Sequence, residues 1–233
     1  MSKPKKSPSS ARRALRRNLI AAAVLVAALA AALGSFLLFT PRAPGVDVLD
    51  AAPAAEALPV RGDSHRLTAP KRSEMTVVEF LDFECEGCGA SYPIVERLRK
   101  EYGDRVTFVA RYFPMPGHRN GELAARVAEA AARQGRFEEM YRALFDTQKE
   151  WGEARESKEE VFRGYARRIG LDLARFDADL ADPGTARRVL ADRRDGLALG
   201  VRGTPTFLVD GERISTPRTY EDFKAFLDER LAG

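Results

Sequence analysis

The residues best suited to chemistry are two cysteines, Cys85 and Cys88. They lie in the stretch DFECEGCGASYP (82–93) and are the only cysteines in the chain. A thiol reacts as its anion, and two thiols at this spacing can close a reversible disulfide or bind a soft metal ion. The loop between them is too small to staple a fold, so a structural disulfide framework is excluded. The pair is therefore expected to be redox-active or metal-binding.

The surrounding sequence predicts which thiol attacks. An apolar, β-branched run ends just before Cys85, and a helical pattern begins there. The backbone N–H groups and the dipole at a helix N-terminus stabilise an anion and so lower the pKa of a thiol. Cys88 lies one helical turn further along the chain. We therefore predict that Cys85 is the nucleophile and Cys88 the resolving thiol.

Two carboxylates, Glu84 and Glu86, flank the first cysteine. Glu86 suits the first turn of a helix, but its charge opposes a thiolate at Cys85. At ~7 Å and an effective dielectric of ~40, this repulsion is about 1 kcal/mol. A reduced form destabilised by that amount has a reduction potential ~20–30 mV lower. Both residues are predicted to tune the pair towards a milder oxidant.

The elements that must position the cysteines follow the order β-α-β, a helical block, then β-β-α, which is typical of an α/β fold. The apolar runs predict strands, and the 3.6-residue periodicity predicts helices. A hairpin is expected around Asp210-Gly211. The predicted segments are a strand at 75–83, a helix at 85–103 that contains Pro93, a strand at 105–113, helices from about 120 to 200, a hairpin at 204–216 and a helix at 220–231.

The N-terminal third predicts a membrane anchor and a tether. Residues 1–18 form a basic tail, and residues 19–39 are apolar and uncharged. At about 1.5 Å per residue in a helix, this run spans a hydrocarbon core of roughly 30 Å. A cleaved signal peptide, whose apolar stretch is usually ~7–15 residues, and a buried soluble helix are the alternatives. The Ala/Pro-rich residues 40–72 are expected to be an aperiodic tether.

The charge distribution argues against nucleic acid as a partner. The net charge is +4, but seven basic residues and no acid lie in residues 1–18, so the remainder carries more acidic than basic residues. A nucleic-acid binder is expected to carry its basic excess on the folded domain. Basic residues before an apolar segment stay in the cytoplasm, so the domain after it is expected outside, where thiols tend to oxidise.

Three separated motifs together resemble a known family. They are VVEFLDFECEGC, Pro93 eight residues after Cys85, and GVRGTPTFLVDG. Over residues 73–231 the chain is similar to the membrane-anchored bacterial type of DsbA-like thiol:disulfide oxidoreductase. The resemblance implies a thioredoxin-like fold with an inserted helical domain at about 118–200, preceded by one transmembrane helix.

The resemblance also implies roles for three further residues. Pro205 would be cis and pack against the disulfide, and Thr204 would offer backbone groups to an extended substrate. Glu79 would be a buried acid that accepts the proton of the resolving thiol, since burial raises a carboxyl pKa towards neutrality. A solvent-facing strand carboxylate is the alternative for Glu79, but its place within Val77-Val78-Glu79-Phe80-Leu81 favours burial.

The two histidines of the chain have simpler expected roles. His118 follows FPMPG at the entry to the helical block and could approach the active-site face, but a capping or surface position is the expectation favoured here. His65 falls in the predicted tether and is expected to be solvated.

The expected function is a monomeric, extracytoplasmic thiol–disulfide oxidoreductase that introduces disulfides into exported proteins. The family implies that a quinone-linked membrane thiol oxidase of the DsbB or VKOR kind re-oxidises it, and no cofactor is needed. A disulfide reductase or isomerase of the same fold is the alternative within redox chemistry. From other classes, a metal carrier such as a copper carrier and a tethered chaperone domain with a vestigial cysteine pair are also retained.

Overall fold

The computed structural model describes residues 57–233, whose strands form a five-stranded sheet in the order β1-β3-β2-β4-β5. The strands are β1 (His65–Arg66), β2 (Met75–Leu81), β3 (Val106–Tyr112), β4 (Thr206–Val209) and β5 (Glu212–Arg213). β2 and β3 are parallel, and every other pair is antiparallel. In this register Glu79 of β2 lies between Ala110 of β3 and Phe207 of β4.

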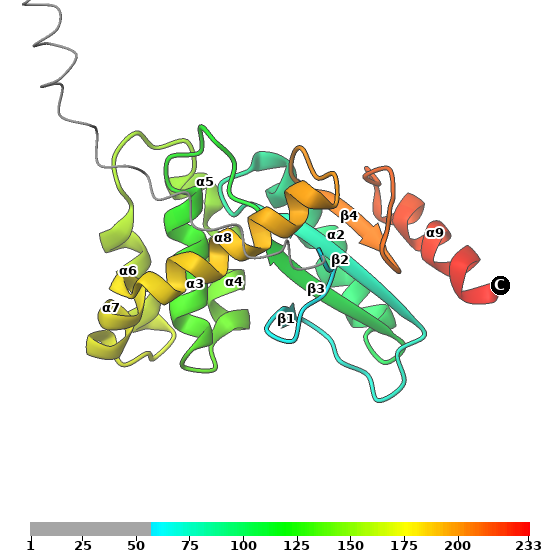
Figure 1. The fold of residues 1–233 in the computed structure, drawn as a ribbon, viewed down its shortest axis with the longest axis horizontal. Helices are drawn as coiled ribbons and strands as arrows, with labels where there is room; N and C mark the ends of the chain where they lie inside the picture. The colour runs from blue at the N-terminus through cyan, green and yellow to red at the C-terminus, as the bar shows by residue number, and fades with distance from the viewer. Residues whose placement is uncertain (1–56) are drawn as a thin grey trace, which may run out of the picture. The chain divides into compact units, whose positions relative to one another are not determined.

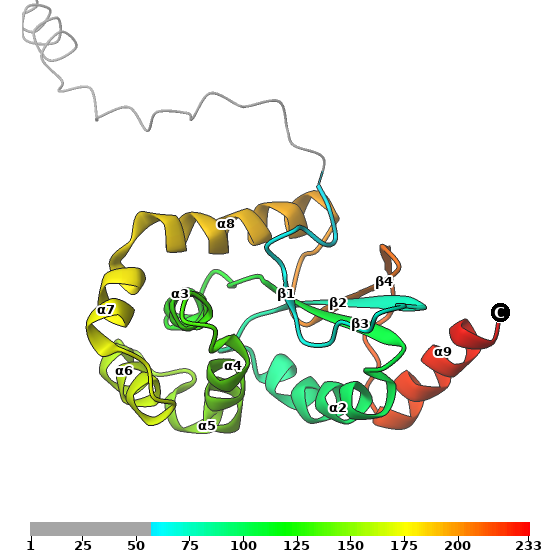
Figure 2. The same cartoon turned by 90° about the horizontal axis from the view of Figure 1, so that it is seen from below.

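Helices cover both faces of the sheet (Figure 2). Helix α8 (Pro183–Ala198) crosses one face, while α2 (Glu86–Tyr102) and α9 (Tyr220–Ala232) lie on the other. Because both faces are covered, β2 and β3 are almost continuously buried instead of alternating between buried and exposed residues. The approach of α8 is close: a Cβ on Gly196 would lie 2.7 Å from the Phe113 ring. A larger residue at this position would force the helix away from the sheet.

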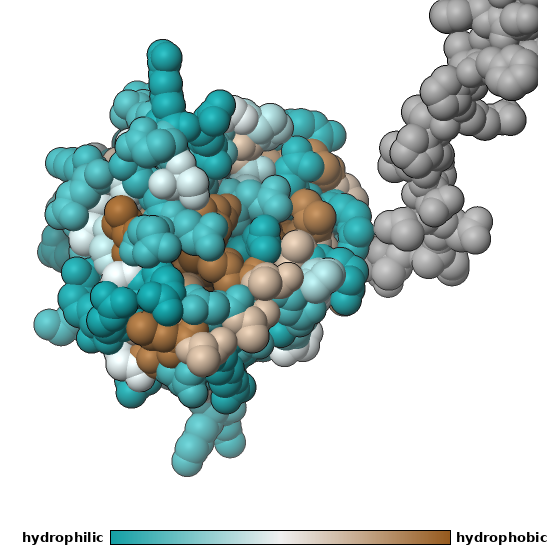
Figure 3. Space-filling view, turned by 90° about the vertical axis from the view of Figure 1, so that its left-hand side faces the viewer, coloured by the Kyte–Doolittle hydropathy of each residue, from teal (hydrophilic) through white to brown (hydrophobic). Residues whose placement is uncertain are grey.

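The helical block forms one end of the described domain (Figure 1). It occupies the place in the chain predicted for the insertion, between β3 and β4. Helix α3 packs against α4, α6, α7 and α8, and its alanines allow these neighbours to approach closely. Figure 3 shows that hydrophilic side chains cover most of the outer surface of this end, with small apolar areas between them. Besides α8, the helices of this block are α3 (Gly121–Ala132), α4 (Phe137–Asp146), α5 (Gln148–Trp151), α6 (Glu159–Arg168) and α7 (Leu173–Ala181).

The C-terminal part follows the sequence prediction. β4 and β5 form the expected hairpin, and both turn residues have positive φ, 48° at Asp210 and 86° at Gly211. Asp and Gly are among the residues that adopt this conformation most readily. Helix α9 then begins at the predicted place, where the Thr219 hydroxyl accepts a hydrogen bond from the Asp222 amide.

The domain begins earlier than residue 73, so the predicted tether is wrong for its last part. Strand β1 pairs with β3, and the Leu67 amide donates to the Phe108 carbonyl at 2.8 Å. The side chain of His65 is only 14% exposed, is stacked on Phe137 and is bonded to Glu129. A strand of two residues is too short to produce an alternating pattern, which is why the sequence did not reveal it.

A buried arginine joins the sheet to α8 and to the N-terminal segment. Arg111 of β3 is fully buried and donates to Asp192 at 2.7 Å and to Asp195 at 2.6 Å. It also donates to the Pro59 carbonyl at 2.6 Å, and Arg61 pairs with Asp195 as well. A buried charge is tolerated only when it is paired in this way.

Within residues 57–233, no helix is both long and apolar enough to cross a bilayer. The predicted basic tail (1–18), the predicted anchor (19–39) and most of the predicted tether lie outside the described residues.

Candidate active site

The two cysteines lie where β2 gives way to α2, and their environments differ. Cys85 is the N-cap residue of α2 and is partly exposed, whereas Cys88 is fully buried. Both are free thiols in the structure, and Cys85 Sγ lies 3.2 Å from the Thr204 carbonyl oxygen. The backbone amide of Asp82 donates to Cys88 Sγ at 3.5 Å.

This difference separates the pKa values of the two thiols. The pKa of Cys85 is lowered to about 5, chiefly because the Cys88 thiol hydrogen-bonds to its sulfur; the Thr204 side chain and the backbone amides of Cys88 and Gly87 add to this effect, which outweighs the opposing effect of burial. The pKa of Cys88 is raised well above its ordinary value by burial, by the bond to Cys85 and by the charge of Glu79. At neutral pH the partly exposed sulfur is therefore a thiolate and the buried one a thiol.

The loop that precedes β4 lies against Cys85. The Thr204–Pro205 peptide bond is cis, as the resemblance implied. A Cβ on Gly87 would lie 3.1 Å from Pro205 Cδ and 3.6 Å from Cys85 Sγ. The absence of a side chain at Gly87 therefore keeps the approach to the sulfur open along this loop.

Glu79 lies inside the sheet and not at its surface. It is 4% exposed, and its Oε1 has no hydrogen-bond partner among the described residues. Burial, followed by the charges of Cys85 and Glu96, raises the pKa of its carboxyl group to about 8. A carboxyl group with such a pKa can take up or release a proton near neutral pH.

The two flanking carboxylates have different surroundings. Glu84 is buried and accepts hydrogen bonds from the backbone amides of Asn120, at 2.6 Å, and Glu153, at 3.1 Å. It therefore ties the active-site loop to the helical block, a contact that the sequence did not predict. Glu86 is exposed in the first turn of α2.

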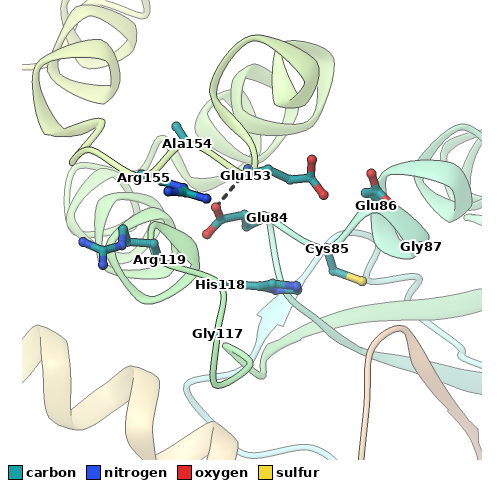
Figure 4. Close-up of a pocket in the computed structure, with 10 residues that line it drawn as sticks. All are labelled: Glu84, Cys85, Glu86, Gly87, Gly117, His118, Arg119, Glu153, Ala154 and Arg155. Atoms are coloured by element: carbon teal, nitrogen blue, oxygen red, sulfur yellow. Dashed lines mark hydrogen bonds between the residues drawn. The ribbon is translucent and has the colours of Figure 1, made fainter.

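His118 lies beside the cysteine pair, and the expectation of a capping or surface histidine is wrong. Its ring lines the same cavity as Cys85, and Nδ1 is 2.6 Å from the carboxylate of Asp82. Figure 4 shows the ring pointing towards Cys85. The position of His118 depends on the path of the loop after β3, which the sequence pattern does not define.

The cavity at Cys85 has a volume of about 410 Å³ and lies between the start of α2, the loop before α3 and the loop after α5. Cys85 and His118 line one part of it, while Arg119 and Arg155 lie at the opposite end (Figure 4). Exposed charged groups thus surround a single partly exposed sulfur.

Gln148 is a further residue of the site that sequence reasoning missed. Its side-chain amide donates to the carbonyls of Phe83, at 2.7 Å, and Cys85, at 2.8 Å, and so fixes the backbone of the active-site loop. A Cβ on Gly89 would lie 2.0 Å from Gln148 Oε1. Gly89, whose missing side chain leaves room for Gln148, is the only feature of the sequence that relates to this contact.

Among residues 57–233, no cluster of three or more His, Cys, Asp or Glu side chains is arranged to hold a metal ion. The arrangement instead suits thiol–disulfide exchange. It combines a stabilised thiolate, a buried partner thiol and a buried carboxyl group that ionises near neutrality.

Comparison with known proteins agrees with this chemistry. A family model described as Thioredoxin matches residues 68–229, and the chain belongs to this family. A solved thioredoxin-like oxidoreductase from Silicibacter pomeroyi DSS-3 is 25% identical, with a TM-score of 0.64, and the match covers 76% of this chain and 98% of that one.

Two further solved structures share the fold. α-DsbA1 from Wolbachia pipientis is 16% identical, with a TM-score of 0.66 over 74% of this chain and 93% of that one. Oxidised BdbD from Bacillus subtilis is 21% identical, with a TM-score of 0.62 over 71% and 92%. The protein therefore has a thioredoxin-like oxidoreductase fold with a helical insertion, similar to DsbA structures.

Curated relatives carry a different name. The Na(+)/H(+) antiporter NhaA of Herminiimonas arsenicoxydans is 36% identical over 156 residues, which are 67% of this chain and 24% of that protein. NhaA 3 of Salinispora tropica is 36% identical over 219 residues, which are 90% of this chain and 32% of that protein. The chain thus spans about a quarter to a third of the length of these relatives.

Proposed function

We propose that the protein is an extracytoplasmic thiol–disulfide oxidoreductase that introduces disulfides into exported proteins through the Cys85–Cys88 pair. The observation that carries this proposal is the stabilised thiolate at Cys85. A thiol whose pKa falls from 9.0 to about 5 favours the reduced enzyme by ~2.7 kcal/mol at pH 7. Because the group is partly exposed and solvent screens its interactions, we take half of this value as the lower limit. A stabilisation of the reduced enzyme by ~1.4–2.7 kcal/mol raises the reduction potential of the pair by ~30–60 mV, compared with a pair whose thiol has the ordinary pKa.

The proposed cycle passes through a mixed disulfide. A substrate thiolate attacks Cys85 Sγ, and the bond to Cys88 breaks. Cys88 leaves as a thiolate and takes a proton from Glu79, and Glu79 accepts this proton again when the pair is re-oxidised, which suits the high pKa of both groups. A second substrate thiol then attacks the substrate sulfur and releases Cys85 as a stable thiolate. Thr204 and Pro205 would hold the substrate chain beside the sulfur.

We infer the location and partners from sequence and resemblance. The domain would be held outside the cytoplasm by a helix over residues 19–39 and would act as a monomer. A quinone-linked membrane thiol oxidase of the DsbB or VKOR kind would re-oxidise it. A solved neighbour with a TM-score of 0.60 is described as a periplasmic thioredoxin-like protein from Salmonella enterica serovar Typhimurium, which supports this location. Ion transport is not proposed, because the chain spans only a minor part of the antiporters.

The reduction potential against glutathione tests the direction of electron flow. A value between about −120 and −200 mV supports an oxidase, and a value near that of thioredoxin, about −270 mV, contradicts it in favour of a reductase. The roles of the cysteines are tested separately. Cys85→Ser should abolish activity, and Cys88→Ser should accumulate mixed disulfides with substrates. If Cys85→Ser traps substrates instead, the two roles are reversed.

A further inference from the structure

His118 is held in one orientation by a buried carboxylate. Asp82 is 2% exposed and lies 2.6 Å from Nδ1 of the ring. The same carboxylate accepts hydrogen bonds from the amides of Glu84, at 2.9 Å, and Met115, at 2.8 Å, so it is itself fixed. In the described part of the chain Nε2 has no hydrogen-bond partner, and the ring points towards Cys85 (Figure 4).

The charges around the ring leave Asp82 and Cys85 as its principal anionic neighbours. Burial of the ring opposes its ionisation, but the hydrogen bond to Asp82 and the charges of Asp82, Cys85 and Glu84 outweigh this effect, so the pKa of His118 is raised. Glu84 is already bonded to two backbone amides. The other charged groups that line the cavity are the exposed side chains of Glu86, Arg119, Glu153 and Arg155.

We propose that His118, with Asp82 as its positioning residue, takes up a proton beside Cys85 and couples its own ionisation to the redox state of the cysteine pair. This inference deepens the proposed function and rests on it. In the dithiol form the imidazolium faces the Cys85 thiolate and stabilises it. In the disulfide form this negative charge is absent, so the ring releases its proton more readily.

The coupling specifies which group accepts the proton of the incoming substrate thiol. An incoming thiol transfers its proton to neutral His118 as its sulfur bonds to Cys85 Sγ. The Cys85–Cys88 bond breaks, and Cys88 leaves with the electron pair and is protonated by Glu79. The second substrate thiol releases its proton to water, and water returns a proton to the Glu79 carboxylate. The second substrate sulfur bonds to the first, and Cys85 leaves as a thiolate. Two electrons thus pass to the enzyme, while one proton stays on His118 and one on Cys88.

The chain offers a direct test because it contains only two histidines. The imidazole resonances of the full chain in detergent micelles can be titrated by NMR in the oxidised and reduced forms. His118 is expected to titrate at higher pH in the reduced form. The second histidine, His65, is bonded to Glu129 and stacked on Phe137 outside the cavity of Cys85, and it serves as the internal control. Equal titration of His118 in the two forms would overturn the proposal.

A pair of variants gives an independent readout. His118→Asn retains a donor for Asp82 but removes the imidazolium, so alkylation of Cys85 by iodoacetamide at pH 4.5 should slow by about three- to tenfold. Arg119→Gln removes one positive charge from the far end of the same cavity and should change this rate less than twofold. Equal slowing in both variants, or in neither, would contradict a specific role for His118.

The two proposals fail in different ways. If the protein oxidises substrate thiols but His118 titrates alike in both forms, only the coupling is refuted. If His118 shifts with redox state but no exchange with protein thiols occurs, the proposed function is refuted, and only the link between the ionisation of His118 and the redox state of the cysteine pair is supported.

Discussion

The buried carboxyl group of Glu79 makes the stability of the reduced protein depend on pH in a defined way. Its pKa is about 8 in the folded reduced state, against an ordinary value of 4.5. Between these values the native protein holds a proton that the unfolded chain has released. The contribution of Glu79 to stability is therefore greatest below pH 4.5 and falls as pH rises, by ~1.4 kcal/mol per unit. The loss is about 3 kcal/mol at pH 7 and about 5 kcal/mol above pH 8.

The substitution Glu79→Gln should remove this dependence. The amide is uncharged at every pH, so the difference in unfolding free energy between the wild type and the variant should change by ~1.4 kcal/mol per unit between pH 5.5 and 7.5. The slope of this difference against pH is a better measure than its absolute value, because the unsatisfied amide of the variant adds a cost of ~1–3 kcal/mol that does not depend on pH. Other titrating groups are common to both proteins and cancel.

Urea unfolding of the reduced protein at several pH values measures this slope. The exposed substitution Glu86→Gln provides the control and should leave the slope of the wild type unchanged. The oxidised protein lacks the Cys85 thiolate, which is one cause of the raised pKa of Glu79, so its dependence should extend over a narrower pH range. Parallel curves for wild type and Glu79→Gln would refute the assignment of Glu79 as a buried, proton-bearing carboxyl group.

Three other perturbations have defined outcomes. Glu86→Gln should raise the reduction potential by ~20–30 mV at low salt and less at high salt; an unchanged potential would mean that solvent fully screens the charge. Gly87→Ala should crowd Pro205 and lower kcat/KM several-fold for peptide thiols but less for dithiothreitol, and an equal loss for both would contradict a substrate groove there. Arg111→Met should destabilise the fold by ~3 kcal/mol in urea unfolding, the lower end of the cost of breaking a buried pair, because Asp192 loses its fully buried partner and keeps Arg188; a neutral effect would contradict that pairing.

Local patterns were sufficient to predict the elements that position the cysteine pair. An apolar run before Cys85 and a helical pattern after it predicted β2 and α2 within two residues, and Asp210-Gly211 predicted the hairpin. These features depend on neighbours in the chain, so their residue types reveal them. The burial of Glu79 also followed from its place in an apolar strand.

Contacts between distant segments could not be predicted in the same way. Strand β1 is stabilised by β3 and by the contacts of His65 with the helical block, and nothing in its own two residues favours a strand. Likewise, the bonds that Gln148 makes to the active-site loop join residues more than sixty positions apart. Their partners are set by how the helical block packs against the sheet.

Spacing and periodicity are local properties, and they were enough to predict the dithiol, the order of the elements and the resemblance to a thioredoxin-like oxidoreductase. The tertiary structure alone decided the electrostatics of the site. It separated the pKa values of Cys85 and Cys88 by directing hydrogen bonds to one sulfur and burying the other, and it turned the carboxylate of Glu84 to two backbone amides. It also brought His118 to the exposed sulfur, since charge interactions depend on distance and burial in space and not on separation along the chain.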